Sequence, residues 1–371
     1  MRVAIVHERF TESGGSEQVV AAIAEMWPDA VIFAAVVDPS VLPATLRGRD
    51  IRTSRLQRRY RGGGYAHLLP FLPGAFAHLD LSSFDLVITS HHAFANRVRP
   101  PAGVPVVSYT YTPARWLWEA RTRRDEPGGL LGRAALATFA ATQRRADRAA
   151  AARLSGVIAI STTVAERVKR WWRRDATVVA PPVDVVRFTP SDAPREDFFL
   201  WVGRLVPYKS PLIAVEAATR AGVPLVIAGD GRMRGRVERA AGSSVRVLGT
   251  VDDATRLDLY RRCRAVVFPG EEDFGLVPVE AQACATPVIA LGAGGATDTI
   301  VDGVTGVLYP PSRDPVDALA SALRSFDPTT FDRETIRRNA LRFAPDRFRR
   351  ELRAAVDAAL ATGGSFSPPS R

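Results

Sequence analysis

Two carboxylates and two cations in the second half of the chain could together bind a sugar attached to a diphosphate. Glu272 and Glu280 lie in the stretch EEDFGLVPVE (271–280), which directly follows an apolar run. This pattern predicts a buried strand, a loop and the first turns of a helix, with both carboxylates near one site. Ionised carboxylates accept hydrogen bonds from sugar and ribose hydroxyls, and a helix N-terminus attracts an anion. Arg204 and Lys209 follow an earlier apolar run and supply charge for phosphates. We therefore expect a nucleotide-sugar site.

The choice of lysine at position 209 strengthens this expectation. The chain has only two lysines, Lys169 and Lys209, against 48 arginines. Lysine binds phosphate as a compact point charge and fits where a planar guanidinium does not. Chance is the alternative explanation for a single residue. The composition favours a phosphate contact for Lys209.

Longer motifs extend the pattern over nearly the whole chain. In order they are SGGSEQVV, LDLSSFDLVITSHHAFANRV, YTYTPARWLWE, VVAPPVDVVRFTP, VGRLVPYKSP, VIAGDGR, VLGTVDD and FPGEEDFGLVPVEAQACATPVIALGAGGATDTIVDGVTGVLYPP. With these motifs the chain resembles the retaining glycosyltransferases of family 4. The detailed pattern resembles their branch of bacterial mannosyltransferases, which use GDP-mannose in surface-polysaccharide synthesis. The resemblance implies an α/β fold of the GT-B type, with two facing Rossmann-like domains and an interdomain cleft.

The resemblance also implies roles for individual residues. Arg204 and Lys209 would hold the diphosphate, and Glu272 would hold the donor sugar. Further donor-binding residues would be Gly14, Gly15, Gly203, Val251, Phe274, Gly275, Leu276, Val277 and Glu280. His92, Tyr111 and Arg115 would lie on the acceptor or sugar side. Ser16 is also a reasonable N-cap for the helix that follows the two glycines. We expect no cofactor and no metal, because Arg204, Lys209 and helix N-termini can meet the phosphate charge.

Tyr111 departs from the family pattern. Relatives typically carry His in the segment that reads YTYTPAR here, and tyrosine is a poor base at neutral pH. Three interpretations follow: Tyr111 makes the contact, His91 or His92 substitutes, or the enzyme is impaired. In a front-face retaining mechanism the departing phosphate can take the acceptor proton, so we favour the first. Asp298 is a smaller departure, because it stands where relatives usually carry the longer Glu.

The chain length and the hydrophobic pattern predict two domains. A chain of 371 residues is too long for one ordinary core. Short runs that are apolar on both faces alternate with helical stretches, which indicates parallel sheets covered by helices. The predicted parts are an acceptor-side domain (1–187), a nucleotide-sugar domain (188–345), a helix crossing back to the first domain (346–361) and a disordered tail (362–371).

The cysteines and the lengths of the apolar stretches indicate the cellular compartment of the protein. Cys263 and Cys284 lie in or beside apolar segments and suit buried thiols in a reducing compartment better than a disulfide. No leader segment is evident, and no apolar stretch approaches the roughly 20 residues needed to cross a bilayer. We expect a cytoplasmic protein, at times peripheral to the inner face of the plasma membrane.

The positive charge is concentrated in the first half. Residues 1–190 contain 26 Lys and Arg against 16 Asp and Glu, whereas the remainder contains 24 against 23. This excess could attract an anionic membrane or a lipid-linked acceptor. A solvated surface and nucleic acid are the alternatives, and we do not expect nucleic acid.

The predicted function is therefore transfer of mannose from GDP-mannose to a saccharide or a lipid-linked saccharide. A transferase that uses a UDP-sugar such as UDP-glucose is one alternative. A non-catalytic carbohydrate-binding relative is the other.

Overall fold

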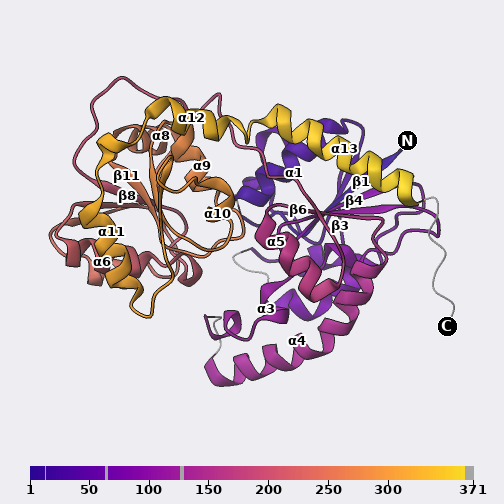
Figure 1. Ribbon diagram of the computed structural model, residues 1–371. Coiled ribbons are helices and arrows are strands. Elements are labelled where there is room, and N and C mark those ends of the chain that lie inside the picture. The colour runs from indigo at the N-terminus through magenta and orange to yellow at the C-terminus, as the bar shows by residue number, and fades with distance from the viewer. Residues whose placement is uncertain (13, 63–65, 126–128, 364–371) are drawn as a thin grey trace. The chain divides into compact units, whose positions relative to one another are not determined.

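The computed structural model describes residues 1–12, 14–62, 66–125 and 129–363, and it forms two compact units (Figure 1). The N-terminal unit comprises Met1–Pro181 and Phe348–Arg371, and the C-terminal unit comprises Pro182–Arg347. The boundaries expected from the sequence, after residues 187 and 345, lie close to these. Each unit is described by itself.

The N-terminal unit is built on a parallel sheet of seven strands in the order β3-β2-β1-β4-β5-β6-β7. Its elements are β1 (Val3–His7), α1 (Gly15–Met26), β2 (Val31–Ala34), β3 (Ile51–Thr53), α2 (Leu72–Ala77), β4 (Leu86–His91), β5 (Val106–Thr110), α3 (Arg115–Trp118), α4 (Gly129–Ala152), β6 (Gly156–Ala159), α5 (Thr162–Arg167) and β7 (Thr177–Val178).

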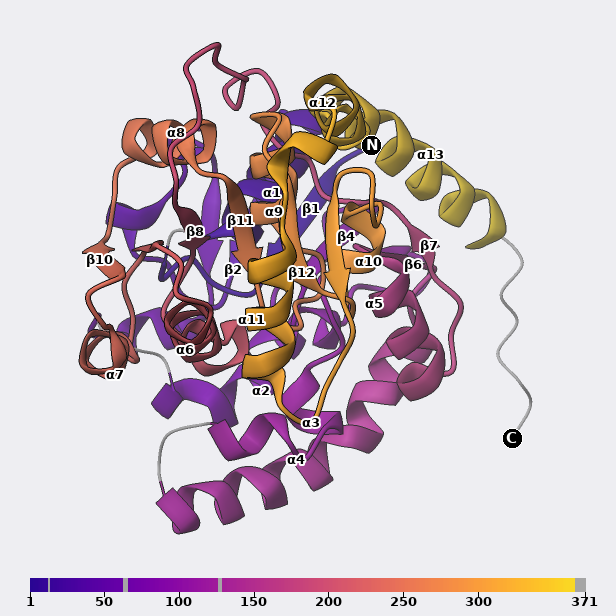
Figure 2. The same cartoon turned by 60° about the vertical axis from the view of Figure 1, so that its left-hand side comes forward.

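The C-terminal unit is built on a parallel sheet of six strands in the order β10-β9-β8-β11-β12-β13. Helices such as α6 and α11 pack on this sheet (Figure 2). The elements are β8 (Phe199–Val202), α6 (Pro211–Ala221), β9 (Leu225–Ala228), α7 (Arg234–Ala240), β10 (Val245–Gly249), α8 (Asp253–Arg262), β11 (Ala265–Phe268), α9 (Leu276–Ala283), β12 (Val288–Leu291), α10 (Ala296–Thr299), β13 (Gly306–Tyr309), α11 (Pro315–Ser325) and α12 (Arg333–Leu341). The last helix, α13 (Pro345–Gly363), begins here and continues in the N-terminal unit.

The central strands of both sheets are apolar because both of their faces are covered. Every residue of β1, β4, β8 and β11 is buried. Buried parallel strands are expected to be continuous apolar runs, and these runs predicted the strands correctly. The predicted α/β class with two Rossmann-like sheets is confirmed. Two short edge strands, β3 and β7, were missed because they are largely exposed and carry little apolar sequence.

The last helix joins the two units in sequence. α13 starts in the C-terminal unit at Pro345, and from Phe348 onward the chain belongs to the N-terminal unit. The Phe348 ring packs edge-on against Tyr109 at a centroid distance of 5.7 Å. Gly156 leaves room for the helix, because a Cβ there would lie 2.6 Å from the Cβ of Ala359. Most of the predicted disordered tail lies outside the described residues, but positions 362 and 363 end α13.

Both cysteines are free and buried, as predicted from their apolar surroundings. Burial raises the pKa of the Cys263 thiol to about 12, and it raises that of Cys284 to about 12 as well. In the part of the chain that the structure describes, no helix is long and apolar enough to span a bilayer.

Candidate functional site

The strongest candidate site lies where the strand order of the C-terminal sheet reverses. β8 and β11 are neighbours, and the chain runs outward from β8 toward β10 and from β11 toward β13. Ligands of open α/β sheets bind beyond the carboxyl ends of the strands at such a point. The loop after β8 carries Lys209, and the loop after β11 carries Glu272. Lys209 Nζ donates to Glu272 Oε1 at 2.6 Å, so the two residues that sequence singled out lie in contact.

This pair is mostly shielded from water. The side chains of Lys209 and Glu272 are 13% and 17% exposed, respectively. Opposite charges in such a setting stabilise each other more strongly than at an open surface. The site therefore holds a cation and an anion that compensate each other's charge.

Arg204 is a second cation near this site, and Tyr208 contacts both Arg204 and Lys209. Arg204 Nη2 donates to the Tyr208 hydroxyl at 3.1 Å, and Lys209 Nζ lies 5.8 Å from the centroid of the Tyr208 ring. Arg204 and Tyr208 are both exposed. Sequence reasoning missed Tyr208, although its position between the two predicted cations was a usable signal.

The N-terminus of α9 follows Glu272 directly. Gly275 precedes the helix with φ of 95°, a left-handed conformation that favours glycine, and the first turn at Leu276 and Val277 has no acidic side chain. The first backbone N–H groups of a helix lack intrahelical partners and attract anions. Phe274, just before this turn, is buried. The predicted residues 274–277 therefore follow Glu272 closely in sequence, and their backbone N–H groups can act as hydrogen-bond donors.

Glu280 lies on α9 and is held by a buried tyrosine. The Tyr260 hydroxyl donates to Glu280 Oε2 at 2.8 Å. Burial raises the pKa of Tyr260 well above its ordinary value, and the Glu280 charge raises it further. Tyr260 therefore stays a donor and keeps the second predicted carboxylate fixed on its helix.

Glycines allow the loops of this site to pack backbone against backbone. A Cβ at Gly270 would lie 2.8 Å from Lys209 Cα, and a Cβ at Gly295 would lie 2.2 Å from Phe274 Cα. The Gly295 N–H also donates to the Glu272 carbonyl at 2.8 Å. The loops after β8, β11 and β12 are thus pressed together around Lys209 and Glu272.

The remaining residues of this unit lie along the same sheet edge. Gly203 follows β8 and lies against Lys209, because a Cβ there would lie 3.3 Å from Lys209 Cδ, and its N–H donates to the Ala228 carbonyl of β9 at 3.0 Å. Val251 follows β10, which β9 separates from β8. Asp298 lies in the short helix α10, just after the loop of Gly295.

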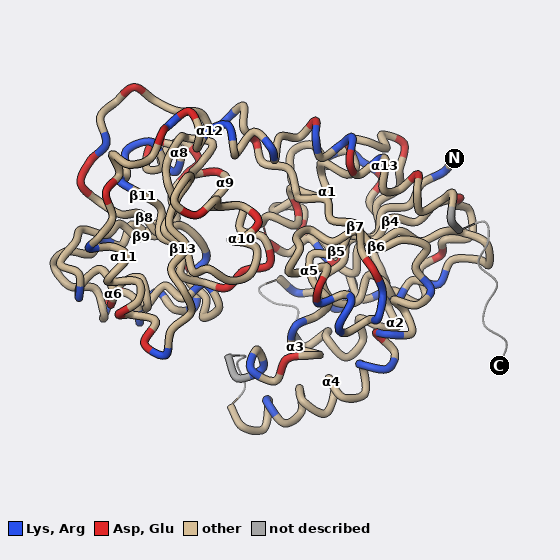
Figure 3. Tube along the Cα trace, in the orientation of Figure 1, with Lys and Arg blue, Asp and Glu red and all other residues tan. Residues whose placement is uncertain are grey.

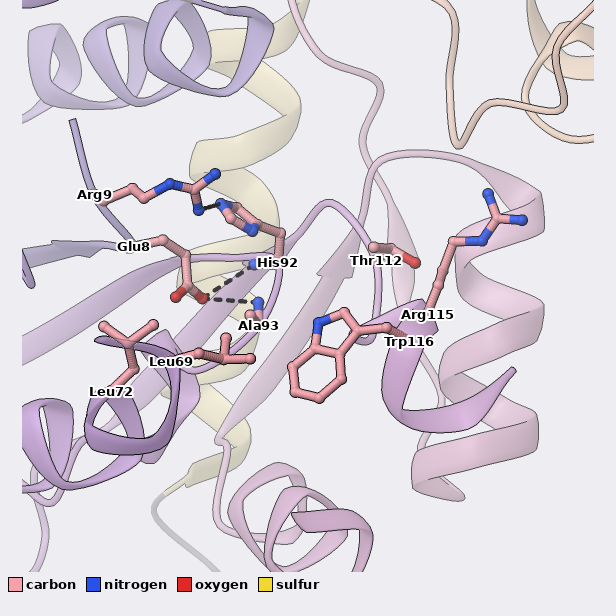
Figure 4. Close-up of a pocket in the computed structure, with 9 residues that line it drawn as sticks. All are labelled: Glu8, Arg9, Leu69, Leu72, His92, Ala93, Thr112, Arg115 and Trp116. Carbon is pink, nitrogen blue, oxygen red and sulfur yellow. Dashed lines mark hydrogen bonds between the residues drawn. The ribbon is translucent and has the colours of Figure 1, made fainter. Parts of the chain in front are cut away.

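In the N-terminal unit, a buried carboxylate organises the loop after β4. Glu8, which is 3% exposed, follows β1. Its Oε1 accepts hydrogen bonds from the backbone N–H groups of four consecutive residues, 92–95, at 2.7–3.3 Å (Figure 4). Glu8 was not predicted from the sequence. It fixes the backbone that carries His92.

A cavity of about 240 Å³ opens beside this loop. In Figure 4, Arg9 and Arg115 stand on opposite sides of it, and the Trp116 indole lies between them. His92 and Arg115 were predicted for an acceptor side, and both line the cavity. The lining residues are Glu8, Arg9, Leu69, Leu72, His92, Ala93, Thr112, Arg115 and Trp116.

Tyr111 belongs to a chain of buried polar groups behind the glycine loop. Its hydroxyl donates to the Ser16 carbonyl at 3.0 Å and lies 3.0 Å from Ser90 Oγ. Ser90 Oγ lies 3.0 Å from His7 Nδ1, and His7 Nε2 lies 3.7 Å from Glu17 Oε1. Because the Tyr111 proton points to Ser16, the Ser90 hydroxyl donates to Tyr111. We call this series the Glu17–Tyr111 relay.

The pKa shifts of Tyr111 and Glu17 keep these two groups of the relay in fixed protonation states. Burial raises the pKa of Tyr111 above its ordinary value of 10, so its hydroxyl keeps its proton at neutral pH. Burial alone would raise the pKa of Glu17, but the contacts with His7 outweigh this and lower it below 4.5. Glu17 is therefore ionised, and Tyr111 acts as a donor rather than as a base.

The two neighbouring histidines differ sharply. His91 is fully buried, and burial together with the Arg97 charge lowers its pKa to about 3. Its Nδ1 accepts from the Asn96 N–H at 3.3 Å. His92 is partly exposed in the cavity wall, and its Nε2 accepts from Arg9 at 3.4 Å. His91 thus cannot supply a group to the cavity, whereas His92 can.

The glycine loop before α1 differs in detail from the prediction. The helix starts at Gly15, and Gly14 is its N-cap, so the expected capping by Ser16 is wrong. Ser16 lies in the first turn, and its hydroxyl donates to Glu17 Oε2 at 2.9 Å instead. A Cβ at Gly14 would lie 3.0 Å from that same oxygen, so glycine keeps the backbone close to Glu17. Among the described residues, no group of three or more His, Cys, Asp and Glu side chains is arranged to hold a metal ion.

Comparison with known proteins gives this geometry a context. Residues 186–341 match the family described as "Glycosyl transferases group 1". The D-inositol 3-phosphate glycosyltransferase of Kribbella flavida is 36% identical over 198 residues, which is 45% of this chain and 46% of that protein. The corresponding protein of Mycobacteroides abscessus is 38% identical over 170 residues, which is 39% of this chain and 38% of that one. The chain thus spans less than half of the length of these curated relatives.

Solved structures match over nearly the whole chain. The Anabaena protein HepE, in complex with UDP and glucose, has a TM-score of 0.72 at 18% identity, covering 96% of this chain and 100% of that chain. The lipopolysaccharide outer core galactosyltransferase WaaB has a TM-score of 0.68 at 18% identity, covering 96% and 99%, respectively. Identities this low establish the fold alone. Residues 186–341 therefore resemble the domain of the group 1 glycosyl transferases, and the chain as a whole has the GT-B fold of two parallel Rossmann-like sheets.

Proposed function

We propose that the chain is a glycosyltransferase that moves a sugar from a nucleotide sugar to an acceptor bound by the N-terminal unit. The observation that carries this proposal is the Lys209–Glu272 pair at the point where the strand order of the C-terminal sheet reverses. The family match of residues 186–341 covers both residues.

Positive charge would hold the diphosphate of the donor, and hydrogen bonds would hold its sugar. Lys209 and Arg204 would bind the diphosphate, helped by the N–H groups that begin α9. The diphosphate would take over the charge of Lys209, which frees Glu272 to accept hydrogen bonds from the sugar. Each hydrogen bond to a charged group contributes about 1.5–3 kcal/mol. The same donors would stabilise the charge that grows on the leaving phosphate, so no metal or cofactor enters the proposal.

For the donor we propose GDP-mannose, on the basis of the motif resemblance, with a UDP-sugar as the second candidate. The UDP-sugar is favoured by the solved neighbour HepE, whose complexes contain UDP, glucose or UDP-glucose. A retaining outcome likewise rests on the resemblance. Glu280, fixed by Tyr260, is our candidate for the contact with the ribose of either nucleotide.

For the acceptor we propose a saccharide, free or lipid-linked, that enters the cavity beside His92. Arg9 and Arg115 provide cationic walls, and Trp116 provides an aromatic face on which a sugar ring can pack. Apolar contact with a few placed polar groups is typical of small-molecule sites. The Glu17–Tyr111 relay would hold the Gly14–Ser16 backbone in position for the donor, with Tyr111 as a positioning residue.

The test is a thermal-shift measurement with GDP, UDP and ADP. The matching nucleotide should raise the melting temperature of the wild type, and Lys209→Met should remove most of this shift. Lys169→Met is the matched control, because Lys169 is the only other lysine and is 76% exposed. If no nucleotide stabilises the wild type while free sugars do, the chain is a carbohydrate-binding relative. An equal shift in Lys209→Met would show that the assigned phosphate site is wrong.

A further inference from the structure

Glu8 presents one of its two carboxylate oxygens to the cavity of the N-terminal unit. The side chain is 3% exposed and is among the residues that line this cavity. Its Oε1 accepts from the four N–H groups of residues 92–95, and the dashed lines in Figure 4 reach this oxygen alone. Oε2 accepts no hydrogen bond from the residues that the structure describes, and protein atoms do not fully enclose it. Buried polar atoms almost always have a partner, so Oε2 is suited to a donor that enters the cavity.

The four N–H groups hold the Glu8 carboxylate in one orientation. They come from consecutive residues and donate at 2.7–3.3 Å, so a rotation of the Glu8 side chain would break all of these hydrogen bonds together. Hydrogen bonds from backbone N–H groups to an ionised carboxylate are stronger than those between neutral groups. An acceptor that is already fixed loses little conformational entropy when a ligand binds to it. Oε2 is therefore a preorganised acceptor in the cavity wall.

The charge of Glu8 is stabilised by N–H groups and not by a paired cation. Among the residues that the structure describes, no Lys or Arg forms an ion pair with Glu8, and Arg97 is a more distant positive charge. His91 Nδ1 lies 3.6 Å from Oε1, but the pKa of His91 is lowered to about 3, so its ring is neutral. That Nδ1 accepts from the Asn96 N–H at 3.3 Å and thus carries no proton for Glu8. A hydroxyl group can donate to such a carboxylate, whereas an anion beside it would be repelled.

The arginines of the cavity wall each have a carboxylate partner. Arg115 Nη2 lies 3.4 Å from Glu119 Oε2. Arg115 begins α3 and Glu119 is its C-cap, so Figure 3 shows a basic and an acidic segment at the two ends of this helix. Arg9 Nη2 lies 3.1 Å from Glu12 Oε1. A guanidinium group has five N–H donors, so both arginines can still donate to the oxygen atoms of a neutral ligand.

Trp116 supplies an aromatic surface between the polar groups of the cavity. Phe139 of α4 stacks on Trp116 with a centroid distance of 5.9 Å and an interplanar angle of 10°, which fixes the plane of the indole. Leu69 and Leu72 also line the cavity, and Figure 4 shows both near Glu8. Apolar walls with a few placed polar groups are typical of small-molecule sites. This combination suits a sugar ring, which has apolar faces and hydroxyl groups around its edge.

We propose that Glu8 binds the acceptor sugar, with Oε2 accepting a hydrogen bond from one hydroxyl group of that sugar. The ring lies on Trp116, with this hydroxyl group toward Glu8 and other oxygen atoms toward Arg115. The hydroxyl group at Glu8 is unsubstituted, because a phosphate or carboxylate in its place would face a buried carboxylate. The inference rests on the proposed function, since it takes the cavity as the acceptor site. It adds a binding residue and a direction in which the sugar lies.

Sugar analogues test this hydrogen bond in the wild type. The probes are the methyl α-glycosides of mannose, glucose and galactose, titrated by saturation-transfer NMR without nucleotide. In the glycoside that binds most tightly, each hydroxyl group is replaced in turn by hydrogen and by fluorine, which cannot donate a hydrogen bond. At the position that contacts Glu8, both replacements should lower the affinity by about tenfold or more. If fluorine restores binding at every position where hydrogen weakens it, the protein donates to each of these hydroxyl groups and the proposal is wrong.

Glu8→Gln tests whether the contact belongs to this residue. Glutamine can keep an oxygen toward residues 92–95 and turn its NH₂ group to the cavity, where it donates instead of accepting. The affinity for the parent glycoside should fall by about tenfold or more. The deoxy analogue that binds weakly to the wild type should then bind to this variant as well as the parent does. An equal loss of affinity for the parent and for every analogue would contradict the proposal, because it would show that Glu8 acts only by holding the loop.

Glu25→Gln is the matched control for the lost charge. Glu25 lies on α1 of the same unit, and its side chain is 42% exposed and paired with Arg349. Binding of the parent glycoside should be unchanged in this variant. If Glu8→Gln does not fold, which its thermal unfolding would show, the comparison of hydrogen with fluorine in the wild type decides.

The remaining outcomes separate this inference from the proposed function. If none of the three glycosides binds to the wild type, the assignment of Glu8 is overturned. None of these titrations uses a nucleotide or requires turnover. The nucleotide-induced thermal shift tests the donor site independently in the same preparations. Failure of sugar binding at Glu8 is thereby distinguishable from failure of the proposed transferase function.

Discussion

Lys209 and Glu272 compensate each other's charge, and this has consequences for ligand binding. A lysine that is 13% exposed and paired at 2.6 Å is held in one position before a phosphate arrives. A donor that brings its own negative charge can replace the carboxylate as the partner of Lys209. Glu272 then becomes available for hydroxyl groups without leaving a cation uncompensated.

Removal of the Glu272 carboxylate should separate sugar chemistry from nucleotide binding. We expect Glu272→Ala to lower transfer by at least about 10²–10³, the usual loss when one preorganised group at the reacting centre is removed. Affinity for the nucleoside diphosphate should stay within a few-fold of wild type, because Lys209 keeps its charge. Glu271→Ala, at the neighbouring carboxylate, is the control and should retain activity. If Glu272→Ala also loses affinity for the nucleotide, the assignment of Glu272 to the sugar alone is wrong.

Tyr111 should matter for stability through its hydroxyl. Tyr111→Phe leaves the Ser16 carbonyl without its donor and Ser90 without its acceptor. A buried polar group that loses its partner costs about 1–3 kcal/mol. Urea unfolding should therefore show the N-terminal unit destabilised by about that amount, whereas Tyr60→Phe, outside the relay, should change stability by less than about 0.5 kcal/mol. A Tyr111→Phe protein as stable as wild type would show that the relay does not hold the glycine loop.

The sequence identifies the site residues that belong to motifs, but not those whose hydrogen-bond partners are distant in the chain. Lys209 and Glu272 stood out by type and spacing alone. Glu8 and Glu17 carry no such signal, because their partners lie on other strands and the pairing depends on how the sheet is assembled. Glu8 at the end of β1 resembles any acidic loop residue until the backbone of residues 92–95 is seen around it.

Glycines, rather than side-chain contacts, determine how closely the loops of the donor site approach each other. Gly295 has an ordinary φ of −68°, so the reason for glycine there is space and not backbone conformation. Its neighbour is the backbone of Phe274, two residues after Glu272, and the Gly295 N–H donates to the Glu272 carbonyl. The spacing of Glu272 from α9 thus depends on a residue of another loop.

An added methyl group at this position should disturb the donor site. Gly295→Ala would place its Cβ 2.2 Å from Phe274 Cα, so we expect the loop to move and nucleotide-induced thermal stabilisation to fall. Gly235→Ala is the matched control in the same unit. Its nearest neighbour is the flexible end of Arg239 at 3.5 Å, and alanine favours a helix such as α7. Unchanged nucleotide binding in Gly295→Ala would show that the close packing of these loops is not required.

The hydrophobic pattern predicted elements well wherever the pattern reflects burial. β1, β4, β8, β9 and β11 were recognised because both of their faces are covered. The pattern did not predict β3 and β7, because an edge strand pairs with only one neighbour and contains few apolar residues.

In the proposed mechanism, the protein alone compensates the negative charge of the phosphates. Transfer should therefore persist in EDTA, since Arg204, Lys209 and the start of α9 supply the positive charge. Initial rates with and without chelator, followed by added Mg²⁺ or Mn²⁺, measure this. Activity that disappears in EDTA and returns with the cation would contradict the proposed metal-free stabilisation and would direct attention to the acidic run at 271–273.

The central claim is that the protein cleaves a nucleotide sugar and transfers its sugar. The most direct measurement is release of nucleoside diphosphate from GDP-mannose, UDP-glucose and an ADP-sugar, each with and without lipid-linked saccharide acceptors. The account predicts release from one of these donors that rises when an acceptor is present, and it predicts no release by Glu272→Ala. If the wild type binds a nucleotide but releases none from any donor with any acceptor, the protein is a binding relative and the proposed transferase activity is wrong.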